Sequence, residues 1–223
     1  MKMEKMLVAW SGGKDSALAL YTIQEEGIEI SALLTTVTEQ YNRISMHGVR
    51  QILLERQSHA LGIPLEKVFI PPETSNEIYE ARMSALLLKY ANQGVTTVVF
   101  GDVFLEDIRT YRENHLFKVG MKAFFPLWKK HSLELAHEFL NLGFKAIITC
   151  VDSNAIDGSF VGRIFDKTFL SEIPSTVDPC GENGEFHSFV YDGPNFLEQI
   201  PYEKGKTVVR DNRFYFCDLI PRR

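Results

Sequence analysis

The chain of 223 residues is predicted to be an α/β protein, with a doubly wound, mainly parallel sheet followed by a smaller α+β part. Apolar runs of strand length alternate with helical patterns in the first half, and a glycine-rich turn joins the first strand to the first helix. After Trp128, glycines, prolines and short strands become denser. We therefore divide the chain into two parts, 1–128 and 129–223, which we expect to pack together.

The first strand and helix are predicted close to the N-terminus. Leu7–Trp10 is a continuous apolar run, which is typical of a buried strand. Ala17, Leu18 and Tyr21 then recur at helical spacing until Gly27 ends the helix. The charged N-terminal residues run straight into this strand, so we interpret them as its beginning and not as a signal peptide.

Short apolar runs predict more strands of the parallel sheet, at 30–36, 67–70 and 96–100. A loop is expected at 39–46, and helices are expected at 49–61 and from about 77 to 94. The buried side of the first of these helices is predicted to carry Val49, Ile52, Leu53, Ala60 and Leu61. Thr74 and Glu77 resemble a capping box for the second. This βαβα order favours helices on both faces of the sheet.

The second part is predicted to begin with a helix at 132–142 and a strand at 145–151. Three short strands follow, at 187–191, 207–210 and 214–219. Asp211-Asn212 separates the last two, which indicates a hairpin turn.

The turn after the first strand carries the most specific pattern in the chain. It consists of Ser11, Gly12, Gly13, Lys14, Asp15 and Ser16. The glycines allow an anion to approach the backbone, and the helix start and its dipole favour a phosphate there. The serine hydroxyls and the lysine add donors and a positive charge. The sequence therefore predicts a nucleotide phosphate site at this turn.

Two better-known phosphate loops are excluded by the spacing. A Walker loop has four residues between its glycines and a Ser or Thr directly after the lysine, whereas here Gly12 and Gly13 are adjacent and Asp15 follows Lys14. A dinucleotide fingerprint needs a third glycine deeper in the turn. The remaining structural alternative is an ordinary strand-to-helix corner of small residues.

Ligands of doubly wound sheets bind at the carboxyl ends of the strands. Gly101-Asp102 follows the strand at 96–100, so this pair and the turn at 11–16 are expected at the same edge. We predict that the base of the nucleotide lies near Thr35 and Gly101. His47 follows the loop that should overhang the nucleotide, and is either a contact to it or a residue of the helix start.

A second dense group of polar residues lies at 178–187. Within it, Glu182, Asn183, Gly184, Glu185 and His187 are candidates for binding an ammonium group, positioning a general base or holding Mg²⁺. The glycines on this segment suggest a tight, exposed backbone. The structural alternative is a polar surface loop.

Composition excludes several classes of protein. The net charge of −5 argues against a nucleic-acid partner, and no apolar run approaches the length of a membrane span. The three cysteines are widely spaced and form no CxxC pair, which argues against a zinc or iron–sulfur site. Their odd number favours free thiols in a reducing cytoplasm. The remaining histidines, His59, His115, His131 and His137, are expected at the surface. The charged residues at 106–113 either belong to the site or form a solvated helix face.

Several motifs occur together in one order. They are SGGKDS at 11–16, MHGVR at 46–50, VFGDVFLEDIRTYRE at 99–113, FPLW at 125–128 and CGENGEFHSFVYDGP at 180–194. This combination resembles the diphthine–ammonia ligase family, a branch of the PP-loop ATP pyrophosphatases, over nearly the whole chain. The GENGEFH form is similar to the bacterial branch. The resemblance implies a HUP-type (adenine nucleotide alpha hydrolase-like) fold, with ATP bound by 1–128 and the acceptor by 129–223.

The resemblance also implies a reaction. A substrate carboxylate is adenylated by ATP with release of pyrophosphate, and ammonia then displaces AMP to leave an amide. Lys14, Asp15, Glu185 and His187 are the expected catalytic residues, and Asp15 and Asp102 are candidate Mg²⁺ contacts. Glu182, Asn183, Gly184, Glu185 and His187 are the expected acceptor site.

Other functions remain open at this point. The acceptor could be protein-borne diphthine or another carboxylate, such as a corrinoid-salvage intermediate. The same loop occurs in tRNA-modifying enzymes and in ATP-binding regulators without catalysis. The nitrogen could come from free ammonia or a partner glutaminase, and a homodimer is possible.

Overall fold

The computed structural model describes residues 5–41, 43–44, 47–72 and 74–222. The first part contains a sheet whose strands are β1 (Lys5–Ala9), β2 (Glu29–Thr38), β3 (Arg43–Ile44), β4 (Leu65–Ile70), β5 (Thr97–Val99) and β6 (Lys122–Phe124). β1 lies between β2 and β5, β4 pairs with β2, and β6 pairs with β5, all in parallel. Only the short β3 is antiparallel, at the end of β2. The predicted parallel sheet is thus confirmed.

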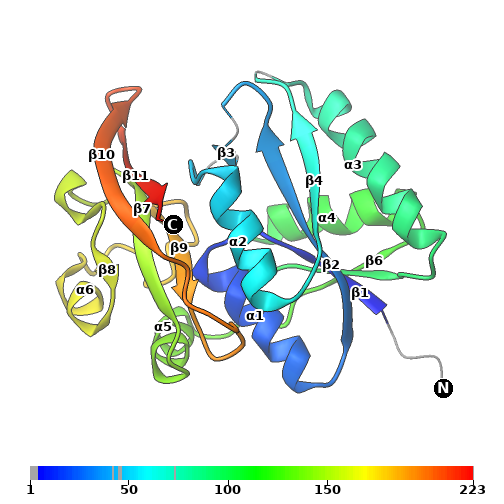
Figure 1. Ribbon diagram of the computed structural model, residues 1–223, viewed down its shortest axis with the longest axis horizontal. Helices are drawn as coiled ribbons and strands as arrows, with labels where there is room; N and C mark the ends of the chain where they lie inside the picture. Colours follow the sequence, from blue (N-terminus) through cyan, green and yellow to red (C-terminus); the bar gives the residue numbers. More distant parts are fainter. Residues whose placement is uncertain (1–4, 42, 45–46, 73, 223) are drawn as a thin grey trace.

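Helices cover both faces of this sheet, as expected. α1 (Lys14–Glu25) and α2 (Gln51–Leu61) lie between the two sheets, whereas α3 (Asn76–Ala91) and α4 (Glu106–Lys118) lie on the outer face (Figure 1). The strand order of the parallel sheet reverses direction at β1, because its neighbours β2 and β5 lead to opposite halves of the sheet. This is the position at which such sheets bind ligands.

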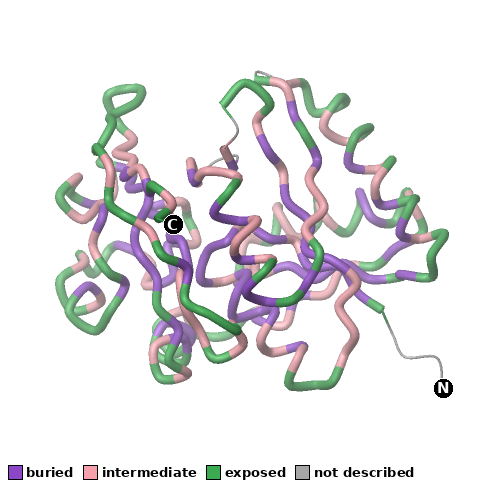
Figure 2. The backbone as a smooth tube through the Cα atoms, in the orientation of Figure 1, coloured by how far each residue is buried: buried purple, intermediate pink, exposed green. Residues whose placement is uncertain are grey.

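The second part is built on an antiparallel sheet. Its strands are β7 (Lys145–Asp152), β8 (Ile164–Phe165), β9 (Phe186–Asp192), β10 (Tyr202–Arg210) and β11 (Phe214–Pro221). β7 pairs with β8, β9 and β11, and β10 forms the edge beside β11. The helices are α5 (Ser132–Asn141), α6 (Lys167–Glu172) and the 3₁₀ turn η1 (Gly158–Phe160). The β10–β11 hairpin is largely exposed near its tip (Figure 2).

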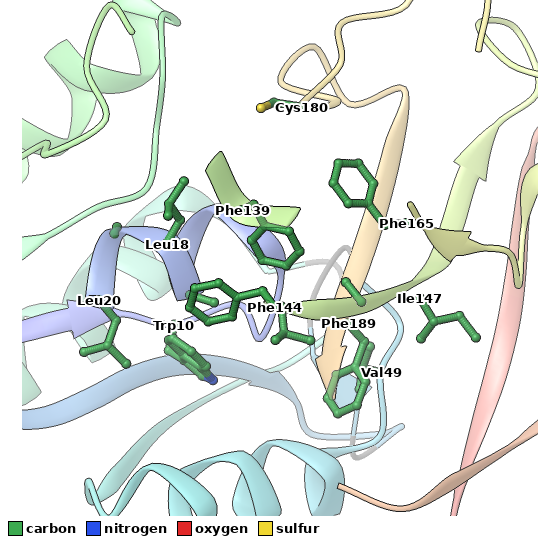
Figure 3. Close-up of a cluster of buried hydrophobic side chains, with 14 of the residues drawn as sticks. Trp10, Leu18, Leu20, Val49, Phe139, Phe144, Ile147, Phe165, Cys180 and Phe189 are labelled. Atoms are coloured by element: carbon green, nitrogen blue, oxygen red, sulfur yellow. The ribbon is translucent and has the colours of Figure 1, made fainter. Parts of the chain in front are cut away.

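One hydrophobic core runs through both parts. It joins Leu18, Leu20 and Ile23 of α1 to Phe139 of α5 and Phe189 of β9, and Figure 3 shows several of these side chains together. A smaller core lies under α3 and α4 on the outer face of the parallel sheet. Because burial of apolar area drives folding, the shared core fixes how the two parts meet.

Several sequence predictions need correction. In α2, Ile52 is 43% exposed, while Leu54 and Gln57 are fully buried. The cap of α3 is Ser75, whose hydroxyl accepts from the Ile78 N–H, and the Thr74 hydroxyl instead bonds to the Pro71 carbonyl. β10 begins at Tyr202 because its pairing with β11 extends past the β-bulge at Lys204/Thr207. β3, β6, β8 and α6 are too short to give a pattern in the sequence.

The predicted loop at 39–46 and the MHGVR motif are only partly described by the structure. Asn42, Ser45 and Met46 lie outside the described residues. None of the helices in the described part of the chain has the length and apolar content that a membrane crossing requires.

Candidate functional site

A cavity of about 500 Å³ opens at the carboxyl ends of β1, β2 and β5, beside β9 of the second part. Most residues of the 11–16 turn line its polar end. The sequence motifs at 46–50, 99–113 and 180–194 also contribute to its wall, through His47, Gly101, Asp102, Gly181 and His187. Residues far apart in the chain thus meet at the predicted edge of the sheet.

The turn is held in place by a side chain that sequence reasoning missed. Gln57 of α2 is fully buried, and its Nε2 donates to the carbonyls of Gly12 and Val190 at 2.9 and 2.7 Å. Its Oε1 accepts from the Trp10 indole at 2.9 Å. Gly12 has φ +78°, and a Cβ there would lie 2.7 Å from Gln57 Oε1. A glycine is therefore required at this position.

Strand β9 touches the turn from the second part. The Val190 N–H donates to the Gly12 carbonyl at 2.9 Å, and the Ser188 hydroxyl accepts from the Lys14 N–H at 3.1 Å. The Ser16 hydroxyl bonds to the Gly13 carbonyl and lies 3.2 Å from that of Ser11. Gly13, the N-cap of α1, has no capping side chain. This leaves the positive end of the helix dipole facing the cavity.

Lys14 is buried at 2% exposure, and its ammonium lies 2.7 Å from the Asp15 carboxylate. It also donates to the Cys180 carbonyl and lies over the Phe186 ring, 5.6 Å from the ring centre. Burial lowers the pKa of Lys14, but Asp15, Cys180 and Glu182 together outweigh this effect, and the pKa stays above its ordinary value. Lys14 is therefore a fixed positive charge on the cavity wall.

His47 and His187 form a pair, with ring centres 4.5 Å apart and planes tilted by 36°. Burial, with the neighbouring Lys14 charge, lowers the pKa of His187 to about 4. Burial and the neighbouring His187 lower the pKa of His47 well below its ordinary value. The Nδ1 of His47 is buried without a hydrogen-bond partner of regular geometry. Both imidazoles are therefore uncharged at pH 7.

Thr35 and Gly101 both line the cavity, as the predicted base site requires. The Thr35 hydroxyl is buried without a hydrogen-bond partner, which is costly unless a ligand or water supplies one. A Cβ on Gly101 would lie 2.8 Å from the Asp15 backbone, so the glycine lets β5 approach the start of α1. The cavity continues into an apolar end that was not predicted from the sequence, lined by Tyr79, Met83, Leu87, Phe100 and Leu116.

Asp102 lies in the cavity wall and pairs with Arg112 of α4, 2.9 Å from Arg112 Nε. Within the described residues, no three His, Cys, Asp or Glu side chains are grouped closely enough to hold a metal ion. Asp15 and Asp102 nevertheless supply two carboxylates to the same cavity. This donor set fits Mg²⁺, which binds to one or two carboxylates when phosphates supply other ligands.

The charged face at 106–113 serves several purposes. Arg109 pairs with Glu113 at 2.8 Å, four residues apart, and its guanidinium lies 4.7 Å from the Trp128 ring centre. This part agrees with the solvated-face interpretation, while Arg112 belongs to the cavity. His115 was expected at the surface, but it is buried and lies 3.0 Å from the Ser84 hydroxyl. His59, His131 and His137 are exposed.

The predicted acceptor residues do not all face the cavity. Glu182 accepts from the Val103 N–H at 2.7 Å, which joins the two parts beside Asp102. Glu185 is buried inside its own loop, where it accepts from the N–H groups of Asp178 and Asn183, both at 3.0 Å, and from the Asn183 amide. Gly184, with φ +86°, completes the tight turn. Of the group, only His187 is in the cavity wall.

Comparison with known families matches both parts of the chain. The diphthamide synthase N-terminal domain matches residues 4–123, and the diphthamide synthase C-terminal domain matches residues 131–217. The boundary that we place at Trp128 falls between these two matches.

Curated relatives carry the name diphthine–ammonia ligase. The one from Schizosaccharomyces pombe is 24% identical over 96% of this chain, which spans only 38% of the relative's length. The human one is 22% identical over 89% of this chain and 83% of its own length, and the bovine one is 24% identical over 89% and 82%. A solved structure, a predicted subunit of tRNA methyltransferase from Methanocaldococcus jannaschii, has a TM-score of 0.45 and 16% identity, covering 64% of this chain and 77% of that one.

Proposed function

This chain belongs to the diphthamide synthase family, and from that premise we propose that it is an ATP-dependent ligase that joins a substrate carboxylate to ammonia. The observation that carries the proposal is Lys14, a buried ammonium at the start of α1 on the wall of a cavity. The relatives named diphthine–ammonia ligase support the class of reaction. The cavity, about 500 Å³, is of ordinary size for a small-molecule site.

The phosphates of ATP bind the turn at 11–16. Lys14 supplies the charge, and the Ser11 and Ser16 hydroxyls and the start of α1 supply donors and a positive dipole. The base lies beside Thr35 and Gly101, where the Thr35 hydroxyl lacks a partner. Mg²⁺, when bound, neutralises phosphate charge, and Asp15 and Asp102 would hold it.

The reaction follows in two steps. An oxygen of the substrate carboxylate attacks the α-phosphorus, the bond from that phosphorus to the oxygen bridging to the β-phosphate breaks, and pyrophosphate leaves. The nitrogen of ammonia then attacks the acyl carbon, and AMP leaves with the electrons of the acyl–oxygen bond. The nitrogen loses a proton to solvent in this step, and the neutral His187 imidazole in the cavity wall accepts a hydrogen bond from the attacking nitrogen.

The second part supplies the acceptor side. Asn183 and Gly184 lie on the loop that Glu185 orders, and Glu182 ties this loop to the backbone at Val103. In this proposal Glu185 contributes by shaping the acceptor site and not by touching the acceptor. The acceptor is protein-borne diphthine or a related small carboxylate.

ATP–pyrophosphate exchange tests the proposal. Labelled pyrophosphate should enter ATP only when a carboxylate that the protein adenylates is present, so we expect exchange with a diphthine-bearing protein or a related carboxylate. Lys14→Ala removes the positive charge that is proposed to bind the phosphates, and it should abolish the exchange.

Two outcomes would contradict the ligase. Binding of ATP without exchange for any carboxylate would favour a non-catalytic regulator. Exchange or ATP cleavage that depends on tRNA would favour a tRNA-modifying enzyme.

A further inference from the structure

His47 reaches the cavity from the segment between β2 and α2. Among the described residues of this segment, Arg43–Ile44 form the short strand β3. The Gly48 N–H donates to the Ile44 carbonyl at 3.1 Å, and the Ile44 N–H donates to the Val49 carbonyl at 2.8 Å. These bonds close a turn around His47, and the pairing of β3 with β2 joins this turn to the parallel sheet.

A carboxylate of the second part joins the same turn to the antiparallel sheet. Asp218 on β11 accepts from Arg43 Nη2 at 3.0 Å, from Arg50 Nε at 3.0 Å and from Arg50 Nη2 at 2.6 Å. Arg43 Nη1 also donates to the Gly48 carbonyl at 2.7 Å. The two arginines flank His47 in the sequence, so one side chain holds the segment on both sides of the histidine.

Packing on the same strand adds to this anchor. Gly48 has φ +67°, and a Cβ there would lie 2.8 Å from the Phe216 ring. Phe216 precedes Asp218 by two residues, so both side chains lie on one face of β11. The Arg210 guanidinium of β10 lies 5.5 Å from the ring centre of Tyr41 and 5.7 Å from that of Phe216. The hairpin therefore contacts the segment on both sides of β3.

An isolated surface ion pair would contribute little. Here the Asp218 side chain is only 18% exposed and binds two guanidinium groups, one of them through both carboxylate oxygens. Such bidentate geometry fixes orientation as well as distance. We propose that Asp218 is a positioning residue for ATP binding, which sets His47 against the nucleotide by holding Arg43 and Arg50. This inference rests on the proposed function, because it assumes that ATP is the ligand.

A double-mutant cycle on ATP affinity, measured by calorimetry, tests the inference. We expect His47→Ala to weaken ATP binding about tenfold and Asp218→Asn to weaken it by a similar factor. Because Asp218 acts only through His47, the double variant should be no more than about threefold weaker than either single variant. Asp218→Glu, which keeps the charge, should recover most of the affinity.

Asp152→Asn is the matched control. Asp152 makes a comparable pair with Arg213, at 2.7 Å from Arg213 Nε, in the same sheet but without contact to Arg43 or Arg50. It should leave ATP affinity within about twofold of the wild type and show no coupling to His47→Ala. If Asp218→Asn does not fold, Arg43→Gln removes one arm of the anchor and replaces it in the cycle.

The outcomes separate the two claims. If the wild-type protein does not bind ATP, the proposed function fails and this inference fails with it. If ATP binds but Asp218→Asn leaves the ATP affinity unchanged, only the positioning role is overturned. The same holds if the double variant loses ATP affinity by the product of the two single-variant factors.

Discussion

The negative charge of Glu182 destabilises the folded protein by an amount that depends on pH. Burial raises the pKa of this carboxyl to about 7, even though the hydrogen bond from the Val103 N–H lowers it. The Asp15 and Asp102 carboxylates raise it as well. The folded protein therefore binds the proton more tightly than the unfolded chain does, and this group makes the protein less stable as pH rises from about 4.5 to 7.

We expect Glu182→Gln to reduce this pH dependence. The amide keeps an oxygen for the Val103 N–H but has no charge, so between pH 5 and pH 8 the variant should lose less stability than the wild type, by roughly 1–3 kcal/mol. Urea unfolding at the two pH values measures the difference. His47 and His187 act in the opposite direction, since their stability contribution is lost as pH falls below about 6.5, but this is common to both proteins. Parallel pH curves for wild type and variant would contradict the prediction.

Among the elements, α2 and β9 decide the shape of the phosphate turn. Within the described part of the chain, Gln57 of α2 bonds both to Val190 of β9 and to the Trp10 indole. Gln57→Leu fills the same space but leaves the Trp10 indole N–H and the Val190 carbonyl without their bonds. Buried polar groups without partners cost about 1–3 kcal/mol each, so we expect a loss of about 2–4 kcal/mol in urea unfolding.

Gln51→Leu is the control on the same helix. Among the described residues, Gln51 bonds to Glu55, one turn along α2, at 2.8 Å, so its loss should change stability by less than about 0.5 kcal/mol. Equal stabilities for the two leucine variants would mean that Gln57 does not hold the turn.

The sequence predicted elements well where the periodicity was long, and poorly where a single polar side chain mattered. The parallel sheet, α1 and the turn at 11–16 follow from apolar runs and glycine placement. Gln57 could not be found in this way, because a buried glutamine on an amphipathic helix looks like one more solvated residue. For Glu185 the sequence pattern suggested a functional role, because it is an acidic residue in a glycine-rich loop. Its hydrogen bonds, however, lie within that loop.

At the scale of the whole molecule, residues of both parts line the cavity. The parallel sheet provides the phosphate turn, and β9 closes it through Ser188 and Val190. The shared core, in which Tyr21 of α1 lies 5.8 Å edge-on from Phe144, holds this arrangement. A sequence pattern within either part could not reveal such contacts, because they join residues more than a hundred positions apart.

The products of ATP turnover test the central claim most directly. If the turn at 11–16 acts as proposed, wild-type protein given ATP, ammonia and an accepted carboxylate should yield AMP and pyrophosphate in equal amounts, resolved by chromatography of labelled ATP. Lys14→Ala should lower this rate by at least about a hundredfold, as loss of a preorganised charge does. ADP and phosphate as the main products, or an unchanged rate in Lys14→Ala, would contradict the account.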